Sequence, residues 1–201
     1  MITFYHSPQS RSTRVLALIH ELGARDRIDL RRVSIARQDG SGGPDPVNPH
    51  PDGKVPMLDH DGVLVWESAA IMTYLTECFP EAGMGAAPGA PGRGRFLSWM
   101  AWYAGVMEPV IVHDAAGLSH PILDVTFRGV PQLTARLEAA LAEGPWLMGD
   151  RFSAADLLCH SPYAWFPEVT PDVPAIRDWV ARCQDRPAVR RAAEEDADLA
   201  A

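Results

Sequence analysis

Residues 48–58 read Asn-Pro-His-Pro-Asp-Gly-Lys-Val-Pro-Met-Leu, and residues 65–75 read Val-Trp-Glu-Ser-Ala-Ala-Ile-Met-Thr-Tyr-Leu. A residue before proline favours extended backbone, so the N–H and C=O of Val55 are expected to be free to pair with another extended peptide. Ser68 stands where a hydroxyl can cap a helix, and the free N–H groups there favour an anion. Glu67 can accept from an ammonium group. The two segments therefore predict a site for a zwitterionic amino-acid head beside a peptide backbone.

The residues around these segments predict a small α/β unit. Between the two strands of a hairpin lies His60-Asp61-Gly62, with glycine available for a positive φ. Residues 36–53 are rich in Gly, Pro, Asp and Asn, which predicts a long surface loop. Alternation and helical spacing of apolar residues predict strands at 1–6, 31–35, 55–58 and 63–66, and helices at 12–22 and 68–79.

The second half of the chain is helical in pattern. Residues 80–94 carry so many prolines and glycines that no regular element persists, which predicts an interdomain linker. Helices are expected at 96–113 and 130–142, from Ser153 onward, and at 174–193. The predicted organisation is an α/β domain at 1–79, a linker at 80–94 and an all-helical domain at 95–201.

The pattern of Asn-Pro, Gly-Lys-Val-Pro and Leu, followed by Glu-Ser, Ala-Ile and Tyr-Leu, resembles the glutathione-binding half of the soluble glutathione transferases. This resemblance implies a thioredoxin-like α/β N-terminal domain followed by an all-α helical bundle. It also implies that Pro56 is cis, that the backbone before it pairs with the cysteinyl part of glutathione, and that the γ-glutamyl head is bound at the Glu-Ser pair. The implied glutathione-binding residues are Lys54, Val55, Pro56, Glu67 and Ser68.

The first turn of the chain, in residues 4–15, is where this family places the group that contacts the glutathione sulfur. A free thiol has a pKa of about 8.5, and lowering it by about two units stabilises the thiolate by roughly 2.7 kcal/mol. A hydroxyl donor and a helix N-terminus can supply this. Ser10 is the first candidate because it lies at the expected strand-to-helix turn. The alternatives are Ser7, Ser12 and Tyr5.

Each candidate in this turn also has a purely structural interpretation. Ser10 or Ser12 could serve only to cap the helix, and Tyr5 could only pack its ring at the end of the strand. Arg11 could add positive charge near the sulfur or be a solvated surface residue. Several branches of the family place a cysteine in this turn, whereas the first cysteine here is Cys78. The sequence therefore predicts a serine- or tyrosine-dependent enzyme and disfavours a mixed disulfide on the protein.

Residues 145–157, Pro-Trp-Leu-Met-Gly-Asp-Arg-Phe-Ser-Ala-Ala-Asp-Leu, resemble the family's C-terminal signature. Ser153 and Asp156 have the spacing of a capping box, and Phe152 with Leu157 has that of a hydrophobic staple. On the helix after the linker, where the family places the wall of its pocket for the electrophile, apolar and aromatic residues recur at helical spacing. The residues implied for that pocket are Trp99, Trp102, Tyr103, Val106 and Met107.

Composition argues against several other classes of function. The formal net charge is -8, which disfavours nucleic acid as a partner. The acidic residues at 194–198 are expected to form a solvated, frayed end. Seven histidines include no HExxH pattern, and Cys78, Cys159 and Cys183 have no CxxC spacing, so no metal site is expected. With no signal peptide or membrane span apparent, a cytoplasmic protein is expected.

Together these features predict a glutathione S-transferase that activates the thiol of glutathione, its co-substrate, for attack on a small apolar electrophile, with a role in detoxification. The sequence leaves open a glutathione-dependent isomerase or peroxidase, and a non-catalytic binding or regulatory protein of the same fold. The resemblance also implies a homodimer.

Overall fold

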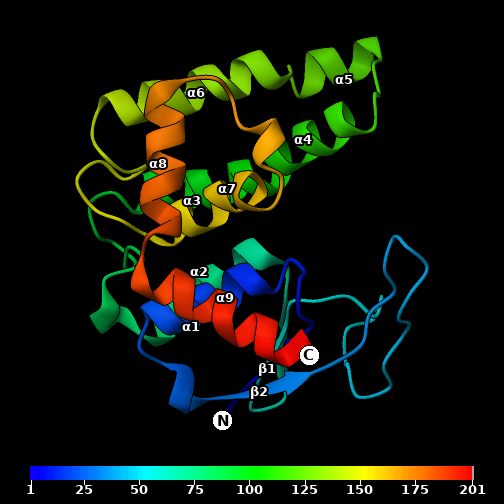
Figure 1. Cartoon of the computed structure of the whole chain (residues 1–201). Coiled ribbons are helices and arrows are strands. Elements are labelled where there is room, and N and C mark those ends of the chain that lie inside the picture. Colours follow the sequence, from blue (N-terminus) through cyan, green and yellow to red (C-terminus); the bar gives the residue numbers. More distant parts are fainter. Residues whose placement is uncertain (201) are drawn as a thin grey trace. The chain divides into compact units, whose positions relative to one another are not determined.

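The computed structural model describes residues 1–200, and its first unit is built on a four-stranded mixed sheet (Figure 1). The strands are β1 (Ile2–His6), β2 (Ile28–Arg32), β3 (Met57–His60) and β4 (Val63–Trp66), in the order β2-β1-β3-β4. β2 pairs in parallel with one side of β1, and β3 pairs antiparallel with the other side. β4 pairs antiparallel with β3 and forms a hairpin with it. Asp61 and Gly62 both have positive φ in the hairpin turn, as its two-residue geometry requires.

Three helices pack in this unit: α1 (Thr13–Glu21), α2 (Ser68–Cys78) and α9 (Pro187–Ala200). α1 contacts both α2 and α9. Its apolar face, Val15, Leu16, Leu18 and Ile19, is fully buried, which is what the spacing of these residues predicts. Short 3-10 helices, η1 (Arg25–Arg27) and η2 (Pro80–Ala82), complete the unit.

The chain divides into two units, and the division differs from the one expected. The first unit is Met1–Ala82 together with the segment from Arg186, and the second is Gly83–Asp185. The last helix thus belongs with the α/β unit rather than with the helical domain. Arg186 explains the start of this segment: its guanidinium donates to both carboxylate oxygens of Glu21 on α1, at 2.5 and 2.8 Å.

The expected frayed acidic end is also corrected by the structure. Glu195 accepts from His20 and from Arg25, each at 2.8 Å, and Asp196 is 5% exposed and hydrogen-bonded to the first turn. Paired charges on the inner face of α9 hold the helix against α1. Glu194 does point to solvent.

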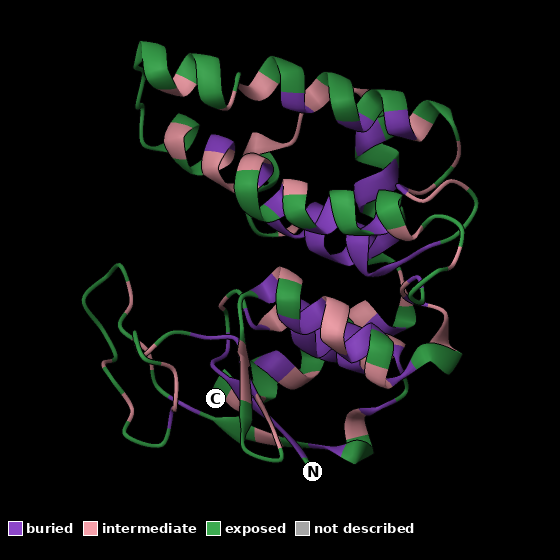
Figure 2. Cartoon of the chain, turned by 180° about the vertical axis from the view of Figure 1, so that it is seen from behind, coloured by how far each residue is buried: buried purple, intermediate pink, exposed green. Residues whose placement is uncertain are grey.

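The second unit is all-helical, as expected. Its elements are α3 (Arg93–Trp102), the π-helical turn η3 (Tyr103–Met107), α4 (Glu108–Ala115), α5 (Pro121–Thr126), α6 (Val130–Ala142), α7 (Ala154–Trp165), the 3-10 turn η4 (Pro167–Val169) and α8 (Pro174–Gln184). α7 lies at the centre, buried on every side from Ala154 to Tyr163 (Figure 2). Burial on every side is typical of a core helix, and α7 carries the buried polar residues Asp156, His160 and Ser161 among its apolar ones.

Several element boundaries differ from the predicted ones for local reasons. The predicted strand at 31–35 lies at Ile28–Arg32, and the helix predicted at 174–193 is two helices, because Pro187 cannot continue α8. The helix predicted at 96–113 begins at Arg93 and contains the π-helical turn η3. The short helix α5 was not predicted.

The capping box at the start of α7 is confirmed. Asp156 Oδ2 accepts from the Ser153 N–H at 3.0 Å, and its Oδ1 accepts from the Leu147 N–H at 2.9 Å and the Trp179 indole N–H at 3.0 Å. Asp156 has no exposed surface. One buried carboxylate therefore ties together the N-terminus of α7, the preceding loop and α8.

Candidate active site

The register of the strands brings the three predicted segments to the same end of β1, β3 and β4. Tyr5 on β1 lies opposite Met57 on β3, and Met57 lies opposite Trp66 on β4. The residues just beyond these pairs are the turn after β1, Val55-Pro56 before β3, and Glu67-Ser68 after β4. Three separate segments, at 7–12, 55–56 and 67–68, thus meet at the same end of three neighbouring strands.

The segment before β3 presents an unused piece of backbone. The Val55–Pro56 peptide bond is cis, as the resemblance implied, and both residues are buried. Within the described residues the Val55 N–H and C=O make no hydrogen bond. Asn48 Nδ2 donates to the Lys54 C=O at 3.0 Å and holds the preceding loop, while the Lys54 side chain is exposed. Val55 therefore offers one donor and one acceptor to a peptide.

Glu67 has a backbone conformation that is rare for a residue with a side chain, with φ 68° and ψ 127°. It occupies the N-cap position of α2, and Ser68 is the first helical residue, so the expectation that Ser68 caps this helix is wrong. The chain turns into α2 through the positive φ of Glu67, and no described side chain forms a capping hydrogen bond at the N-terminus of this helix. The first N–H groups of α2 are left for an anion. Glu67 is exposed and forms no ion pair among the described residues.

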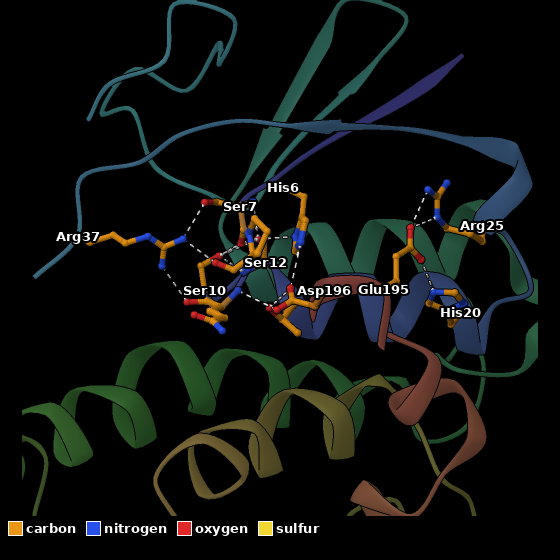
Figure 3. Close-up of polar contacts among 12 residues, drawn as sticks. His6, Ser7, Ser10, Ser12, His20, Arg25, Arg37, Glu195 and Asp196 are labelled. Carbon is orange, nitrogen blue, oxygen red and sulfur yellow. Dashed lines mark hydrogen bonds and ion pairs between the residues drawn. The ribbon is translucent and has the colours of Figure 1, made fainter. Parts of the chain in front are cut away.

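Three serines of the first turn are joined by hydrogen bonds (Figure 3). Ser10 Oγ lies 2.6 Å from the Ser7 C=O and 2.8 Å from Ser12 Oγ. Ser12 Oγ in turn accepts from the Ser7 N–H at 3.2 Å. Gln9 between them has φ 53°, which closes the turn tightly.

The four sulfur-contact candidates differ in exposure. Ser10 is partly exposed, whereas Ser7 and Ser12 are 2% and 0% exposed. Tyr5 packs its side chain in an apolar cluster with Val55, with Met57 on β3 and with Val33 just after β2. Ser10 is therefore the candidate hydroxyl that a ligand reaches without rearrangement of the turn.

Two residues of this network were not predicted. His6, the last residue of β1, places Nδ1 2.8 Å from Ser12 Oγ and Nε2 3.1 Å from Asp196 Oδ1. Asp196 also accepts from the Gln9 N–H at 2.8 Å and from Thr13 Oγ1 at 2.7 Å. Burial would raise the pKa of Asp196, but the hydrogen bonds from His6, Thr13 and Gln9 outweigh burial and hold it below its usual range. A histidine directly before a serine-rich turn was a usable sequence signal for His6; Asp196 had none.

Arg37 fixes the outer side of the turn. Its guanidinium donates to the Pro8 C=O at 2.7 Å and reaches the Ser7 Oγ at 3.3 Å. It lines an open hollow of about 670 Å³ together with residues of the turn and of 32–45. Arg11 is exposed on the turn. A positive charge thus lies beside Ser7, supplied by the long loop rather than by the turn.

The predicted pocket residues lie on α3 and η3 of the helical unit, and they differ in burial. Trp99, Tyr103 and Met107 belong to its core, while Trp102 and Val106 stay partly exposed. The two tryptophan rings stack edge to face with centroids 5.2 Å apart. Three of the five residues therefore build the helical core, and two remain accessible from within this unit.

Among residues 1–200 no group of three metal-ligating side chains is present. No described helix has both the length and the apolar character that a membrane crossing requires.

Comparison with known proteins decides the family. The glutathione S-transferase N-terminal domain model matches residues 7–78 and the corresponding C-terminal domain model matches residues 115–187, together more than two thirds of the chain. The chain belongs to the glutathione S-transferase family. The serine-rich turn, the cis proline and the Glu67-Ser68 pair all lie within the N-terminal match.

Individual relatives agree with this assignment. A curated relative, the disulfide-bond oxidoreductase YfcG of Escherichia coli K12, is 26% identical over 96% of this chain and 94% of its own. The solved glutathione transferase of Methylococcus capsulatus is 28% identical, with a TM-score of 0.80 over 98% of this chain and 99% of the other. A theta class glutathione S-transferase of Xanthomonas axonopodis pv. citri, solved with glutathione bound, is 28% identical with a TM-score of 0.71, each chain covered to 96%.

Proposed function

We propose that this protein binds glutathione at the edge of its sheet and activates the thiol for transfer to a small apolar electrophile. The observation that carries this proposal is the meeting, at one end of β1, β3 and β4, of a partly exposed hydroxyl, an unpaired stretch of backbone and an unpaired carboxylate beside a helix N-terminus. Each matches one part of the tripeptide.

The tripeptide would be held mainly through backbone and charge. The Val55 N–H and C=O pair with the cysteinyl unit, as one strand adds to another. The γ-glutamyl carboxylate lies at the open N-terminus of α2 near Ser68, and its ammonium donates to Glu67. Pro56 and Lys54 shape this segment. A zwitterionic head is thereby matched at both charges.

The sulfur would lie at Ser10, because its hydroxyl is partly exposed and its oxygen already accepts the Ser12 N–H at 3.2 Å. The hydroxyl hydrogen, which points to the Ser7 C=O at 2.6 Å, would turn to the sulfur. A hydroxyl that donates to sulfur stabilises the thiolate over the thiol and lowers the pKa of glutathione. Ser7, Ser12 and Tyr5 would need the turn to open before they reached a ligand, and Arg11 would add charge without direct contact.

The second substrate would be apolar. The partly exposed Trp102 and Val106 offer an aromatic and an aliphatic surface on α3 and η3. π-helical turns such as η3 often occur at functional sites. Trp99, Tyr103 and Met107 are buried, and Trp99 contacts Trp102 edge to face.

Two measurements test the proposal. Glutathione at about 100 times its Kd should stabilise the protein by about 2.7 kcal/mol, read as a rise in Tm. The ultraviolet absorbance of the bound thiolate, titrated against pH, should show a pKa below the free value of about 8.5. The absence of both effects would refute the proposal. Binding without thiolate formation would instead indicate a non-catalytic binding protein.

Disulfide reduction is a second candidate, favoured by the similarity to the E. coli disulfide-bond oxidoreductase over nearly the whole chain. Since the first cysteine is Cys78, on α2, the attacking thiolate would be that of glutathione itself. A panel containing an aryl halide, a hydroperoxide, a maleyl compound and a glutathionyl disulfide separates transferase, peroxidase, isomerase and reductase activities. Turnover of the disulfide alone would favour the reductase.

A further inference from the structure

We propose that His6, held by Asp196 of the C-terminal helix, receives the proton of the glutathione thiol through the hydroxyls of Ser10 and Ser12. This inference rests on the proposed function, and specifically on the sulfur lying at Ser10. It gives the buried His6 and the docked helix α9 a part in the chemistry.

The chain of contacts is continuous from the accessible hydroxyl to the carboxylate. Ser10 Oγ lies 2.8 Å from Ser12 Oγ, which lies 2.8 Å from His6 Nδ1. On the other side of the ring, His6 Nε2 lies 3.1 Å from Asp196 Oδ1 (Figure 3). Every link is short enough for a proton to pass between heavy atoms.

Hydrogen-bond roles follow from the carboxylate. An ionised carboxylate only accepts, so the ring nitrogen that faces Asp196 carries hydrogen. In the neutral ring Nδ1 is then an acceptor, and the Ser12 hydroxyl donates to it. Ser12 Oγ is left to accept from Ser10. In the resting turn the Ser10 hydroxyl donates to the Ser7 C=O at 2.6 Å. When that hydroxyl turns to Ser12 Oγ, 2.8 Å away, the chain is oriented from Ser10 towards His6, the direction in which the proton travels.

The transfer balances without any other reactant. The S–H bond of glutathione breaks as an O–H bond forms on Ser10. Ser10 passes its original hydrogen to Ser12, and Ser12 passes its own to His6 Nδ1. The products are a thiolate and an imidazolium, with the total charge unchanged and both serines neutral again. The reoriented hydroxyl of Ser10 now donates to the thiolate.

The surroundings of His6 favour this acceptor. His6 and Ser12 have no exposed surface, so water does not compete along the inner part of the chain. His6 Nε2 is buried and, among residues 1–200, has no partner other than the Asp196 carboxylate, which faces it at 3.1 Å. Asp196 from α9 stabilises a positive charge on the ring. Arg32, which pairs with His6 on the neighbouring strand β2, is exposed, and Arg37 lies outside the turn. Both cations therefore repel a positive charge on the His6 ring only weakly.

A proton count distinguishes this role from a structural one. Glutathione is added to the wild type near neutral pH, thiolate is measured by ultraviolet absorbance, and released protons are measured with an indicator dye. If His6 keeps the proton, the wild type releases well under one proton per thiolate. His6→Asn retains an acceptor for the Ser12 hydroxyl but cannot take the proton. This variant should release close to one proton per thiolate, and the pKa of its bound thiol should rise by about one unit, or tenfold in thiolate.

Asp196→Asn provides a second, independent variant because it removes the carboxylate that faces His6 Nε2 without changing the ring. Its proton release should also move towards one per thiolate. Glu195→Gln is the matched control, since it lies one position away on α9 and contacts His20 and Arg25 rather than the turn. Its proton release should equal that of the wild type. Glutathione Kd should stay within about twofold in all three variants.

Two results would overturn the inference. One is a wild type that forms thiolate and releases a full proton for each. The other is a folded Asp196→Asn protein with unchanged proton release. A wild type that binds no glutathione, or forms no thiolate, would instead refute the proposed function and the relay with it.

Discussion

Asp196 on the last helix and His6 on the first strand face each other at 3.1 Å, although 189 residues separate them in the chain. The carboxylate also receives the Gln9 N–H and the Thr13 hydroxyl. The C-terminal helix thus completes the turn that holds the candidate sulfur ligand.

Docking of α9 should depend on pH in the acid range. The pKa of Asp196 lies below its usual value because the hydrogen bonds from His6, Thr13 and Gln9 outweigh burial. A lowered pKa in the folded state means that this stabilisation is present above the unfolded value of about 3.8 and is lost as the pH falls through the folded value. Asp196→Asn should therefore lower the free energy of unfolding by about 1–2 kcal/mol near pH 6, and the difference from wild type should vanish at strongly acid pH. Urea unfolding across this range measures both.

The exposed neighbour Glu194 supplies the control. Glu194→Gln should leave the unfolding curve unchanged at every pH. If the difference in unfolding free energy between Asp196→Asn and wild type persisted at strongly acid pH, the charge of Asp196 would not be the source of the stabilisation.

The part of the candidate site formed by Val55-Pro56 and Glu67-Ser68 could be predicted from the sequence, whereas the contact between His6 and Asp196 could not. Val55-Pro56 and Glu67-Ser68 lie on either side of a hairpin, so local turn geometry alone brings them together. Asp196 lies in an acidic helical end that has the composition of a solvated tail. Its docking depends on the packing of α9 against α1, and no local pattern encodes the contact partner of a helix.

The choice among the serines was likewise open in the sequence. Ser7, Ser10 and Ser12 have the same chemistry and nearly the same spacing. Their exposure is decided by the tight turn at Gln9, whose φ is 53°. Asp196 accepts the Gln9 N–H at 2.8 Å and so helps to hold this turn, a contact that no local sequence pattern encodes.

Glu67 should show a conflict between stability and binding. Its positive φ costs of order 1–3 kcal/mol for a residue with a side chain, and glycine avoids that cost. Glu67→Gly should therefore raise the free energy of unfolding by about 1 kcal/mol, less the added entropy of the unfolded chain, while glutathione affinity falls. Loss of a charge-assisted hydrogen bond of about 1.5–3 kcal/mol corresponds to roughly a 10- to 100-fold rise in Kd. Calorimetric titration and urea unfolding measure the two effects.

Arg128 is the matched position for this test. It is exposed, has φ 73° and lies in the helical unit. Arg128→Gly should stabilise similarly without changing glutathione affinity. Equal affinity of Glu67→Gly and wild type would remove Glu67 from the binding site.

Asp156→Asn should be among the most destabilising conservative changes in the chain. The carboxylate accepts the Leu147 N–H and the Trp179 indole on one oxygen and the Ser153 N–H on the other. An amide presents one oxygen and an NH2 group, which leaves at least one buried donor facing another donor. The expected loss is about 2–4 kcal/mol of unfolding free energy. Asp150→Asn, in the exposed loop before α7, should cost nothing measurable, and a similar loss in both variants would contradict this account.

Ser10→Ala should separate activation of glutathione from its binding. The peptide backbone and γ-glutamyl head are held at Val55, Glu67 and Ser68 in the proposed complex, so Kd should change little. The thiolate, however, loses its donor, and kcat/KM should fall about 10- to 100-fold, the equivalent of one charge-assisted hydrogen bond. Ser98→Ala on α3, whose hydroxyl donates to the Gly94 C=O, is the control and should retain full activity. If Ser10→Ala kept the thiol pKa of the wild type, the sulfur contact would belong to another hydroxyl of the turn, and Ser7→Ala and Ser12→Ala would identify which.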